Sequence, residues 1–356
     1  MGEGTKKGRG RAFGAFVAAR GFDPRSSSFN SRRFDGTGMS RPLLIDTDPG
    51  CDDALALLLA LERDELDVVG LSTVHGNASL ADTTRNARSL LECFDRTDVP
   101  LAKGATLPLT AELETAEHIH GAGGIRGELP DPTSATEPLE RHGAQFIVEK
   151  AREYEGELTL AAIGPLTNVA LALAIEPDLP DLLEELIVMG GAAFVPGNVT
   201  PLAEANFRSD PEAAARVVRD ARPTVVGLDV TNGANVPGEW IDSLPESTAV
   251  GRSVVEWFTY YSGDQLEQYE YETTAIHDAL AIAGLVDEDL LETERYHMQV
   301  GTDSDLDRGA LVCDATDVTD GEPNGSVALE ADFERYRELL TGSVERTLDS
   351  LADRRT

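Results

Sequence analysis

The chain has 356 residues, of which 41% are hydrophobic, so it is long enough for one large or two ordinary domains and too apolar for a disordered protein. Its 64 acidic and 30 basic residues give a net charge of −34. Such a surface repels nucleic acids and anionic lipids, and no apolar run approaches the roughly 20 residues of a membrane-spanning helix. We therefore expect neither a nucleic acid nor a membrane as a partner.

The acidity has a simple physical interpretation. Nearly all basic residues are arginine, since lysine occurs only at Lys6, Lys7, Lys103 and Lys150. Acidic residues spread over a whole chain with few lysines are typical of proteins that work in strong salt, where a Debye length of about 3 Å at 1 M screens the self-repulsion. The composition predicts a halophilic protein.

The cysteines indicate the cellular compartment, and the composition of the first 40 residues indicates where the folded domain begins. Cys51, Cys93 and Cys313 match neither a zinc motif nor a disulfide framework, which favours a reducing cytoplasm. Residues 1–40 carry eight Lys and Arg residues against three acidic ones and lack the apolar core of a secretory signal. We expect a disordered basic extension there, or a wrongly assigned start, because Met39 directly precedes the first expected strand.

From residue 41 onward, short apolar strands alternate with helices, which predicts one large α/β domain over 41–356. Its sheet should be mostly parallel and Rossmann-like, with helices on both faces and the site at the carboxyl ends of the strands. The expected strands are 43–45, 68–71, 158–163, 186–189, 224–228 and 310–312. The expected helices are 54–61, 84–94, from Pro165 to about 175, from 210 onward, 279–285 and 333–351.

The densest chemical signal follows the first expected strand. Asp46, Asp48, Asp52 and Asp53 place four carboxylates within eight residues, around a Pro49-Gly50 turn. A helix N-terminus favours negative charge but does not need four acids, and a hard cation with oxygen ligands would offset their repulsion. Ca²⁺ or Mg²⁺ is the candidate, and an ordinary capped helix with surface acids is the alternative.

Two further signals lie later in the chain. His277-Asp278 opens an apolar helix, where a histidine could donate a proton near neutral pH. Met189-Gly190-Gly191 ends a strand, and the following loop carries amide and carboxylate groups suited to sugar hydroxyls. Taken alone, either signal could be purely structural. The loop residues are Asn198, Glu204 and Asn206.

Five ordered motifs together resemble the nucleoside hydrolase family, whose members cleave the N-glycosidic bond of ribonucleosides. They are DTDPGCDDA, HGN, GPLTNVALAL, VMGG…N…AEANF…DPEAA and HDALA, and the likeness covers residues 41–353. The resemblance implies the inosine–uridine-preferring type, a calcium cofactor and a homodimer or homotetramer.

The resemblance also implies a metal site. Asp48 matches the carboxylate that binds Ca²⁺ and takes a proton from the attacking water, and Asp53 matches a bidentate ligand. Asp278 and the main-chain carbonyl of Ile163 complete the implied ligand set. Asp46 is expected to support the motif without binding metal.

The implied substrate contacts come from several motifs. Asp52 and Asn206 match the groups that hold the 2′- and 3′-hydroxyls, and Asn198 and Glu204 match those at the 5′-hydroxyl. The loop that carries Asn198 is one residue longer than in the best-known members, with the extra residue at Val195-Pro196. The remaining matches are Asn77 and Met189 near the ribose, His277 at the leaving base and His120 near the nucleobase. Tyr260, Tyr261, Tyr269 and Tyr271 are candidates for aromatic contact with the base.

Two other functions compete with this one. A haloacid-dehalogenase-type phosphatase also begins with a strand followed by DxD, but it needs a downstream lysine, and only Lys103 and Lys150 are available. A calcium-dependent nucleoside-binding protein without turnover would share the pocket, but the presence of Asp48 and His277 favours an enzyme.

Overall fold

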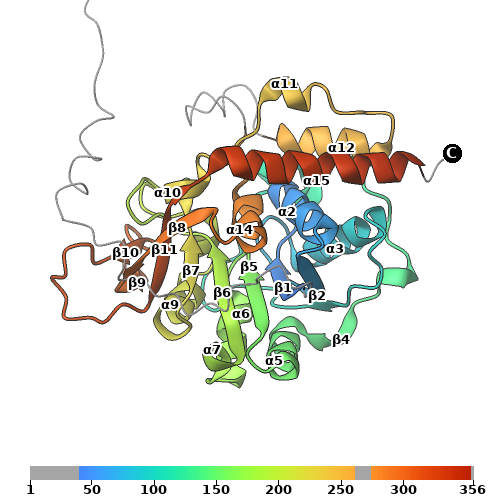
Figure 1. Cartoon of the computed structure of the whole chain (residues 1–356). Coiled ribbons are helices and arrows are strands. Elements are labelled where there is room, and N and C mark those ends of the chain that lie inside the picture. The colour runs from blue at the N-terminus through green and yellow to red at the C-terminus, as the bar shows by residue number, and fades with distance from the viewer. Residues whose placement is uncertain (1–39, 261–273, 354–356) are drawn as a thin grey trace, which may run out of the picture. The chain divides into compact units, whose positions relative to one another are not determined.

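The computed structural model describes residues 40–260 and 274–353. They are organised around a nine-stranded sheet in the order β4-β3-β2-β1-β5-β6-β7-β11-β8 (Figure 1). Strand β8 pairs antiparallel with β11, and the other neighbouring pairs of this sheet are parallel. Its strands are β1 (Arg41–Thr47), β2 (Leu66–Thr73), β3 (Leu101–Lys103), β4 (Leu139–His142), β5 (Leu158–Ala162), β6 (Leu183–Met189), β7 (Thr224–Val226), β8 (Leu291–Tyr296) and β11 (Gly325–Ala331).

Helices cover both faces of the sheet. Helices α12, α14 and α15 pack against α2, and α15 lies across α2 in Figure 1, whereas α6 packs between α5 and α9. The helices are α2 (Cys51–Glu62), α3 (Leu80–Cys93), α4 (Glu117–His120), α5 (Gly143–Tyr154), α6 (Thr167–Ile175), α7 (Leu179–Leu182), α8 (Ala205–Ser209), α9 (Pro211–Asp220), α10 (Leu228–Thr231), α11 (Gly238–Ile241), α12 (Ala249–Phe258), α14 (His277–Val286) and α15 (Phe333–Asp353), with short 3₁₀ turns at Ala122–Gly124 and Ser134–Thr136.

The apolar pattern of the strands explains this layering. In β1, Leu43 and Ile45 belong to the core that contains α2 and α14, whereas Leu44 belongs to the core that contains α5 and α6. Successive side chains of a strand point to opposite faces, so a continuous apolar run needs cover on both sides. Each face therefore has its own hydrophobic core.

The strand order creates a topological switch point between β1 and β5. From β1 the chain builds outward through β2, β3 and β4, then returns to place β5 on the other side of β1. In open α/β sheets a ligand crevice forms outside the carboxyl ends of strands at such a point. The Asp-rich turn that follows Thr47 and the Ile163-Gly164 segment that follows β5 both lie there.

The expected α/β fold with a mostly parallel sheet is confirmed, and the strand at 310–312 needs a correction. Strand β10 (Leu311–Cys313) pairs antiparallel with β9 (Met298–Val300) in a separate two-stranded sheet. The later strand β11 takes the place beside β7 in the main sheet instead. The sequence pattern missed β11 because its continuous apolar run is only three residues long, from Val327 to Leu329.

Within the described ranges, no helix is both long enough and apolar enough to cross a membrane. Cys51, Cys93 and Cys313 are free thiols.

Candidate active site

The turn between β1 and α2 holds Asp53 through four donors. Asp53 is the third residue of α2, and its carboxylate accepts hydrogen bonds from the Thr47 hydroxyl (2.5 Å) and from the backbone N–H of Gly50 (2.9 Å). The Asn77 side-chain amide (3.0 Å) and the Asp48 backbone N–H (3.3 Å) also donate to it. A carboxylate held in this way is fixed in orientation and faces the positive end of the helix dipole.

Asp48 lies beside it with one oxygen held and one free. Its Oδ2 accepts a 2.7 Å hydrogen bond from the backbone N–H of Asn77. Within the described residues its buried Oδ1 has no hydrogen-bond partner. Two glycines pack against this carboxylate, because a Cβ on Gly76 would lie 2.0 Å from Oδ2 and one on Gly164 would lie 2.4 Å from Oδ1. The absence of a side chain at both glycines therefore leaves room for the Asp48 carboxylate.

Carboxylate oxygens of Asp52, Asp53 and Asp278 all lie within 4.8 Å of one another, and all three residues are buried. Burial raises the pKa of Asp52 to about 8, with the charge of Asp53 as the second cause. Burial and the neighbouring carboxylates also raise the pKa of Asp48 and of Asp278 well above the ordinary range. Buried like charges at this spacing require a compensating positive charge, so the donor set fits a cation that prefers oxygen.

The main-chain carbonyls of Ile163 and Met189 meet at Asn206. The Asn206 side-chain amide donates to the Ile163 carbonyl (3.0 Å) and to the Met189 carbonyl (3.2 Å). Residues that follow β5 and β6 are thus connected to the first turn of α8. This places Asn206 in the crevice expected from the strand order.

Glu204 and Asn198 shape the loop after β6. The Glu204 carboxylate accepts hydrogen bonds from the backbone N–H groups of Gly191 (2.9 Å), Asn206 (2.9 Å) and Phe207 (3.2 Å). The Asn198 side-chain oxygen accepts from the backbone N–H of Ala205 at 3.1 Å. In this structure both side chains therefore cap the start of α8.

The two histidines of interest are buried and held in different ways. Nδ1 of His277 lies 2.8 Å from the Thr231 hydroxyl, and burial lowers the pKa of His277 to about 4. The ring of His120 stacks on Tyr260 with 5.0 Å between centroids, and burial lowers its pKa to about 3. His120 Nδ1 accepts the backbone N–H of Cys51 at 3.2 Å and lies 3.9 Å from Asp52 Oδ1. The His120 ring therefore sits directly against the Asp-rich turn.

A cavity of about 110 Å³ lies beside the Asp-rich turn and reaches it at Asp48. Asp48, Asn77 and Asn206 lie in its wall. It is also lined by His118 and by three charged residues that the sequence did not single out, namely Glu112, Glu114 and Arg208. The cavity thus joins the Asp48 carboxylate to the start of α8, where Asn206 lies.

The sequence model of the inosine-uridine preferring nucleoside hydrolase family matches residues 43–338. The chain belongs to this family. It is a ribonucleoside hydrolase, an enzyme that cleaves the N-glycosidic bond.

Similar proteins support this assignment along nearly the whole described chain. The hydrolase is 37% identical over 309 residues to the pyrimidine-specific ribonucleoside hydrolase RihA of Shigella boydii, covering 85% of this chain and 97% of that protein. The plant nucleoside hydrolase PpNRh1 superposes with a TM-score of 0.80 at 32% identity, covering 86% and 99% of the two chains. The purine-preferring ribonucleoside hydrolase of Gardnerella vaginalis superposes with a TM-score of 0.80 at 28% identity, covering 87% of this chain and 99% of that chain.

The phosphatase alternative finds no support in this hydrolase. Lys103 is exposed at the end of β3, and Lys150 forms an ion pair with Glu153 at 2.9 Å. Neither lysine lines the cavity that contains Asp48. The family assignment likewise establishes an enzyme rather than a binding protein.

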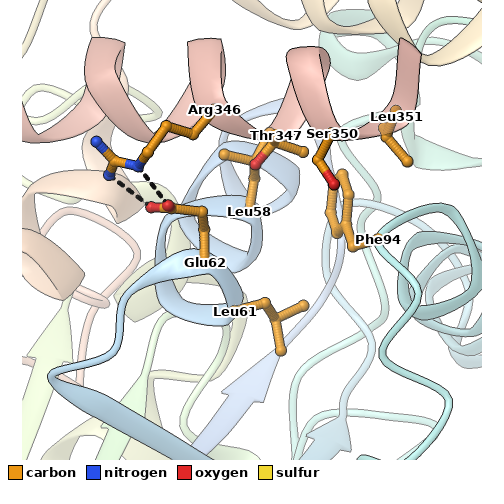
Figure 2. A pocket seen from close by; sticks show the side chains of 8 residues that line it. All are labelled: Leu58, Leu61, Glu62, Phe94, Arg346, Thr347, Ser350 and Leu351. Atoms are coloured by element: carbon orange, nitrogen blue, oxygen red, sulfur yellow. Dashed lines mark hydrogen bonds and ion pairs between the residues drawn. The ribbon is translucent and has the colours of Figure 1, made fainter. Parts of the chain in front are cut away.

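A second cavity, of about 220 Å³, lies away from the acidic cluster at the other end of α2 (Figure 2). Its charged residues, Glu62 and Arg346, bond to each other at 2.5 and 2.7 Å. Leu58, Leu61 and Phe94 supply apolar surface. It holds no group suited to the hydrolysis.

Of the four tyrosines expected near the base, Tyr260 lies within the described residues, and its ring stacks on His120. Tyr261, Tyr269 and Tyr271 lie outside the described residues. The pattern left four tyrosines equivalent because nothing in the spacing shows which of them reaches a histidine from another loop. Glu112, Glu114 and Arg208 were missed because isolated charges carry no motif.

Proposed function

We propose that this hydrolase uses one Ca²⁺ held by Asp48, Asp53, Asp278 and the carbonyl of Ile163. The observation that carries the proposal is the buried cluster of Asp52, Asp53 and Asp278. Asp48 is not one of these three carboxylates, but its backbone N–H donates to Asp53, and its Oδ1 has no hydrogen-bond partner within the described residues. Carboxylate and carbonyl oxygens are the ligands that Ca²⁺ prefers, and six to eight of them leave room for water and sugar hydroxyls. When bound, the ion would lower the pKa of a water molecule and orient it toward the anomeric carbon.

Asp48 acts as the general base in this proposal. Its Oδ2 is held by the Asn77 N–H, so Oδ1 can accept the proton of the attacking water. General-base assistance of this kind typically contributes about 10²–10⁴-fold in rate.

The ribose lies between the Asp-rich turn and α8. Asp52 and Asn206 bind the 2′- and 3′-hydroxyls, and the remaining ribose contacts come from Asn77, Met189, Asn198 and Glu204. Asn198 and Glu204 already accept backbone N–H groups, and their oxygens have further lone pairs for the 5′-hydroxyl. Breaking the N-glycosidic bond builds positive charge on the ribose, which a site lined with carboxylates stabilises.

The leaving base departs on the His277 side. The Thr231 hydroxyl fixes the orientation of the His277 ring through Nδ1, which leaves the second ring nitrogen for the base. In its imidazolium form, which burial disfavours by lowering the pKa to about 4, His277 would donate the proton with which the base leaves neutral instead of as an anion. His120, stacked on Tyr260, contacts the nucleobase from the other side of the pocket.

We further propose that pyrimidine ribonucleosides are the preferred substrates, because the similarity to RihA spans 97% of that enzyme. The free thiols support a cytoplasmic location, and the family resemblance supports a homodimer or homotetramer.

The test is a reducing-sugar assay with uridine, cytidine, inosine, adenosine and 2′-deoxyuridine, in high salt with Ca²⁺. Ribose release from uridine and cytidine that exceeds release from inosine and adenosine supports the proposal. The 2′-deoxyribonucleoside should react poorly, because it lacks a hydroxyl that orients the sugar. A preference for inosine or adenosine would overturn the pyrimidine assignment but leave the calcium site standing.

A further inference from the structure

Three family motifs contribute buried polar residues that the proposed mechanism does not use. They are His75 of HGN, Thr167 of GPLTN and Asp210 of DPEAA. All three side chains are buried, with exposed fractions of 0%, 1% and 0%. They come from the end of β2, the start of α6 and the cap of α9, and they touch.

A chain of short hydrogen bonds connects them. The Thr167 hydroxyl lies 2.6 Å from Asp210 Oδ2 and 3.1 Å from His75 Nε2. Asp210 Oδ2 also accepts the backbone N–H of Leu109 at 2.8 Å, and its Oδ1 caps α9 by accepting the N–H of Ala213 at 3.1 Å. Asp210 therefore serves as an acceptor on both oxygens.

The direction of these hydrogen bonds determines which ring nitrogen of His75 carries the proton. Because Asp210 accepts, the Thr167 hydroxyl donates to it, and the Thr167 oxygen must then accept from His75 Nε2–H. Within the described residues the buried Nδ1 of His75 has no hydrogen-bond partner. The contact with Thr167 is thus the hydrogen bond that orients the His75 ring.

This chain of hydrogen bonds ends beside the turn that holds Asp48. His75 precedes Gly76 and Asn77, and the Asn77 N–H holds Asp48 Oδ2 at 2.7 Å. A Cβ at Gly76, where φ is +155°, would come within 2.0 Å of the same oxygen, so this turn packs tightly on the carboxylate. Any shift of the His75 ring is therefore passed on to Asp48.

The same hydrogen-bond chain also holds the loop that lines the active-site cavity. Leu109 of this loop is bonded to Asp210, and the Ala116 N–H donates to the Asn77 carbonyl at 3.1 Å. Glu112 and Glu114 lie between these two points and line the cavity. Asp210 and Asn77 thus anchor both ends of the cavity-lining segment.

We propose that Thr167, His75 and Asp210 are positioning residues, which fix the turn at residues 75–77 and thereby aim the Asp48 carboxylate. This inference rests on the proposed role of Asp48 as general base. Loss of the Thr167 hydroxyl leaves both nitrogens of a buried imidazole without partners, so the ring must move. Because small misplacements of a catalytic group can cost about 100-fold in rate, the main effect should be on kcat.

The experiment compares three threonine variants with the wild type. Thr167→Val removes the hydroxyl at constant shape, and Thr167→Ser restores it. Thr159→Val is the matched control, because Thr159 is also fully buried and its hydroxyl has no hydrogen-bond partner among the described residues. We expect Thr167→Val to lower kcat for uridine by about 10- to 100-fold with KM changed less than about threefold. Thr167→Ser and Thr159→Val should stay within about threefold of the wild type in kcat.

Amide hydrogen exchange supplies a readout that does not need turnover. Thr167→Val should speed exchange at residues 74–78 and 105–116 relative to Thr159→Val. Unchanged exchange there, or a kcat equal to that of Thr159→Val, overturns the inference. If Thr167→Val does not fold, Asp210→Asn replaces it, and a kcat for that variant equal to the control also overturns it. A wild-type protein that releases no ribose refutes only the proposed function. The exchange comparison then still decides whether the hydrogen bonds of His75, Thr167 and Asp210 position the turn at residues 75–77.

Discussion

Asp53 and Asp278 present carboxylate oxygens within 4.8 Å of each other, although they open helices from opposite ends of the described chain. Helices α2 and α14 pack together so that both N-termini direct their positive ends at this point. Two dipoles ease the repulsion of these buried acids but do not remove it. The proposed cation would offset the repulsion that remains.

Asp48→Asn should lower kcat by about 10²- to 10⁴-fold, because the amide cannot take a proton from water. Steady-state kinetics with uridine measures this. The fold should persist, since the Asn77 N–H can still donate to the side-chain oxygen. Asp67→Asn, an exposed change on β2, is the control and should leave kcat unaltered. Wild-type turnover by Asp48→Asn would remove Asp48 from the mechanism.

His277→Ala should impair natural nucleosides more than substrates with activated leaving groups. Uridine and inosine need a protonated base to depart, so their kcat should fall by about 100-fold or more. Hydrolysis of p-nitrophenyl riboside should change less than about tenfold, because its leaving group departs as a stable anion. Measuring kcat for each substrate gives the comparison. Equal losses on all three substrates would exclude His277 from protonating the base.

Much of the fold and part of the site follow from sequence pattern. The Asp-rich turn after β1 could be placed because an apolar strand, a Pro-Gly turn and acids in a first helical turn are all local signals. The partnership of Tyr260 with His120 could not be predicted, because it depends on how α12 meets a loop far away in sequence. For the same reason, the sequence pattern did not show that the Glu204 carboxylate accepts the backbone N–H groups at the start of α8.

Metal-free protein should lose stability as the pH rises between about 6.5 and 8. The pKa of Asp52 is raised to about 8 from 3.8, so in this range the folded protein binds more protons than the unfolded chain. The stabilisation is complete below pH 3.8 and is lost as the pH rises through about 8, with a slope of about 1.4 kcal/mol per pH unit for one proton. Burial lowers the pKa values of His120 and His277 below 6.5, so these two residues make stability increase with pH. Their effect is confined to pH values below 6.5 and does not oppose that of Asp52 in the range tested.

Thermal unfolding of chelator-treated protein at constant salt measures this effect. Added Ca²⁺ should raise Tm more at pH 8 than at pH 6.5, because the ion favours the ionised carboxylates. A calcium effect that is larger at the lower pH would contradict a cation site among the buried carboxylates to which Asp52 belongs.

The net charge of −34 should make the protein dependent on salt. Raising KCl from about 0.1 M to about 1 M shortens the Debye length from about 10 Å to about 3 Å, which weakens repulsion between surface carboxylates. We expect Tm to rise over this range in a differential scanning experiment. Sucrose at matched osmolality is the control for solvent exclusion and should give a smaller rise. A Tm that falls with KCl would remove the halophilic interpretation.

The most direct test of the account is a calcium titration of stripped protein with binding and turnover measured on the same samples. Ribose release from uridine should be absent without metal and should increase in proportion to bound Ca²⁺, reaching its plateau at one ion per chain. Asp53→Asn should bind the ion far more weakly and lose turnover with it. Full turnover by the stripped wild-type protein, or calcium binding by Asp53→Asn equal to that of the wild type, would contradict the central claim.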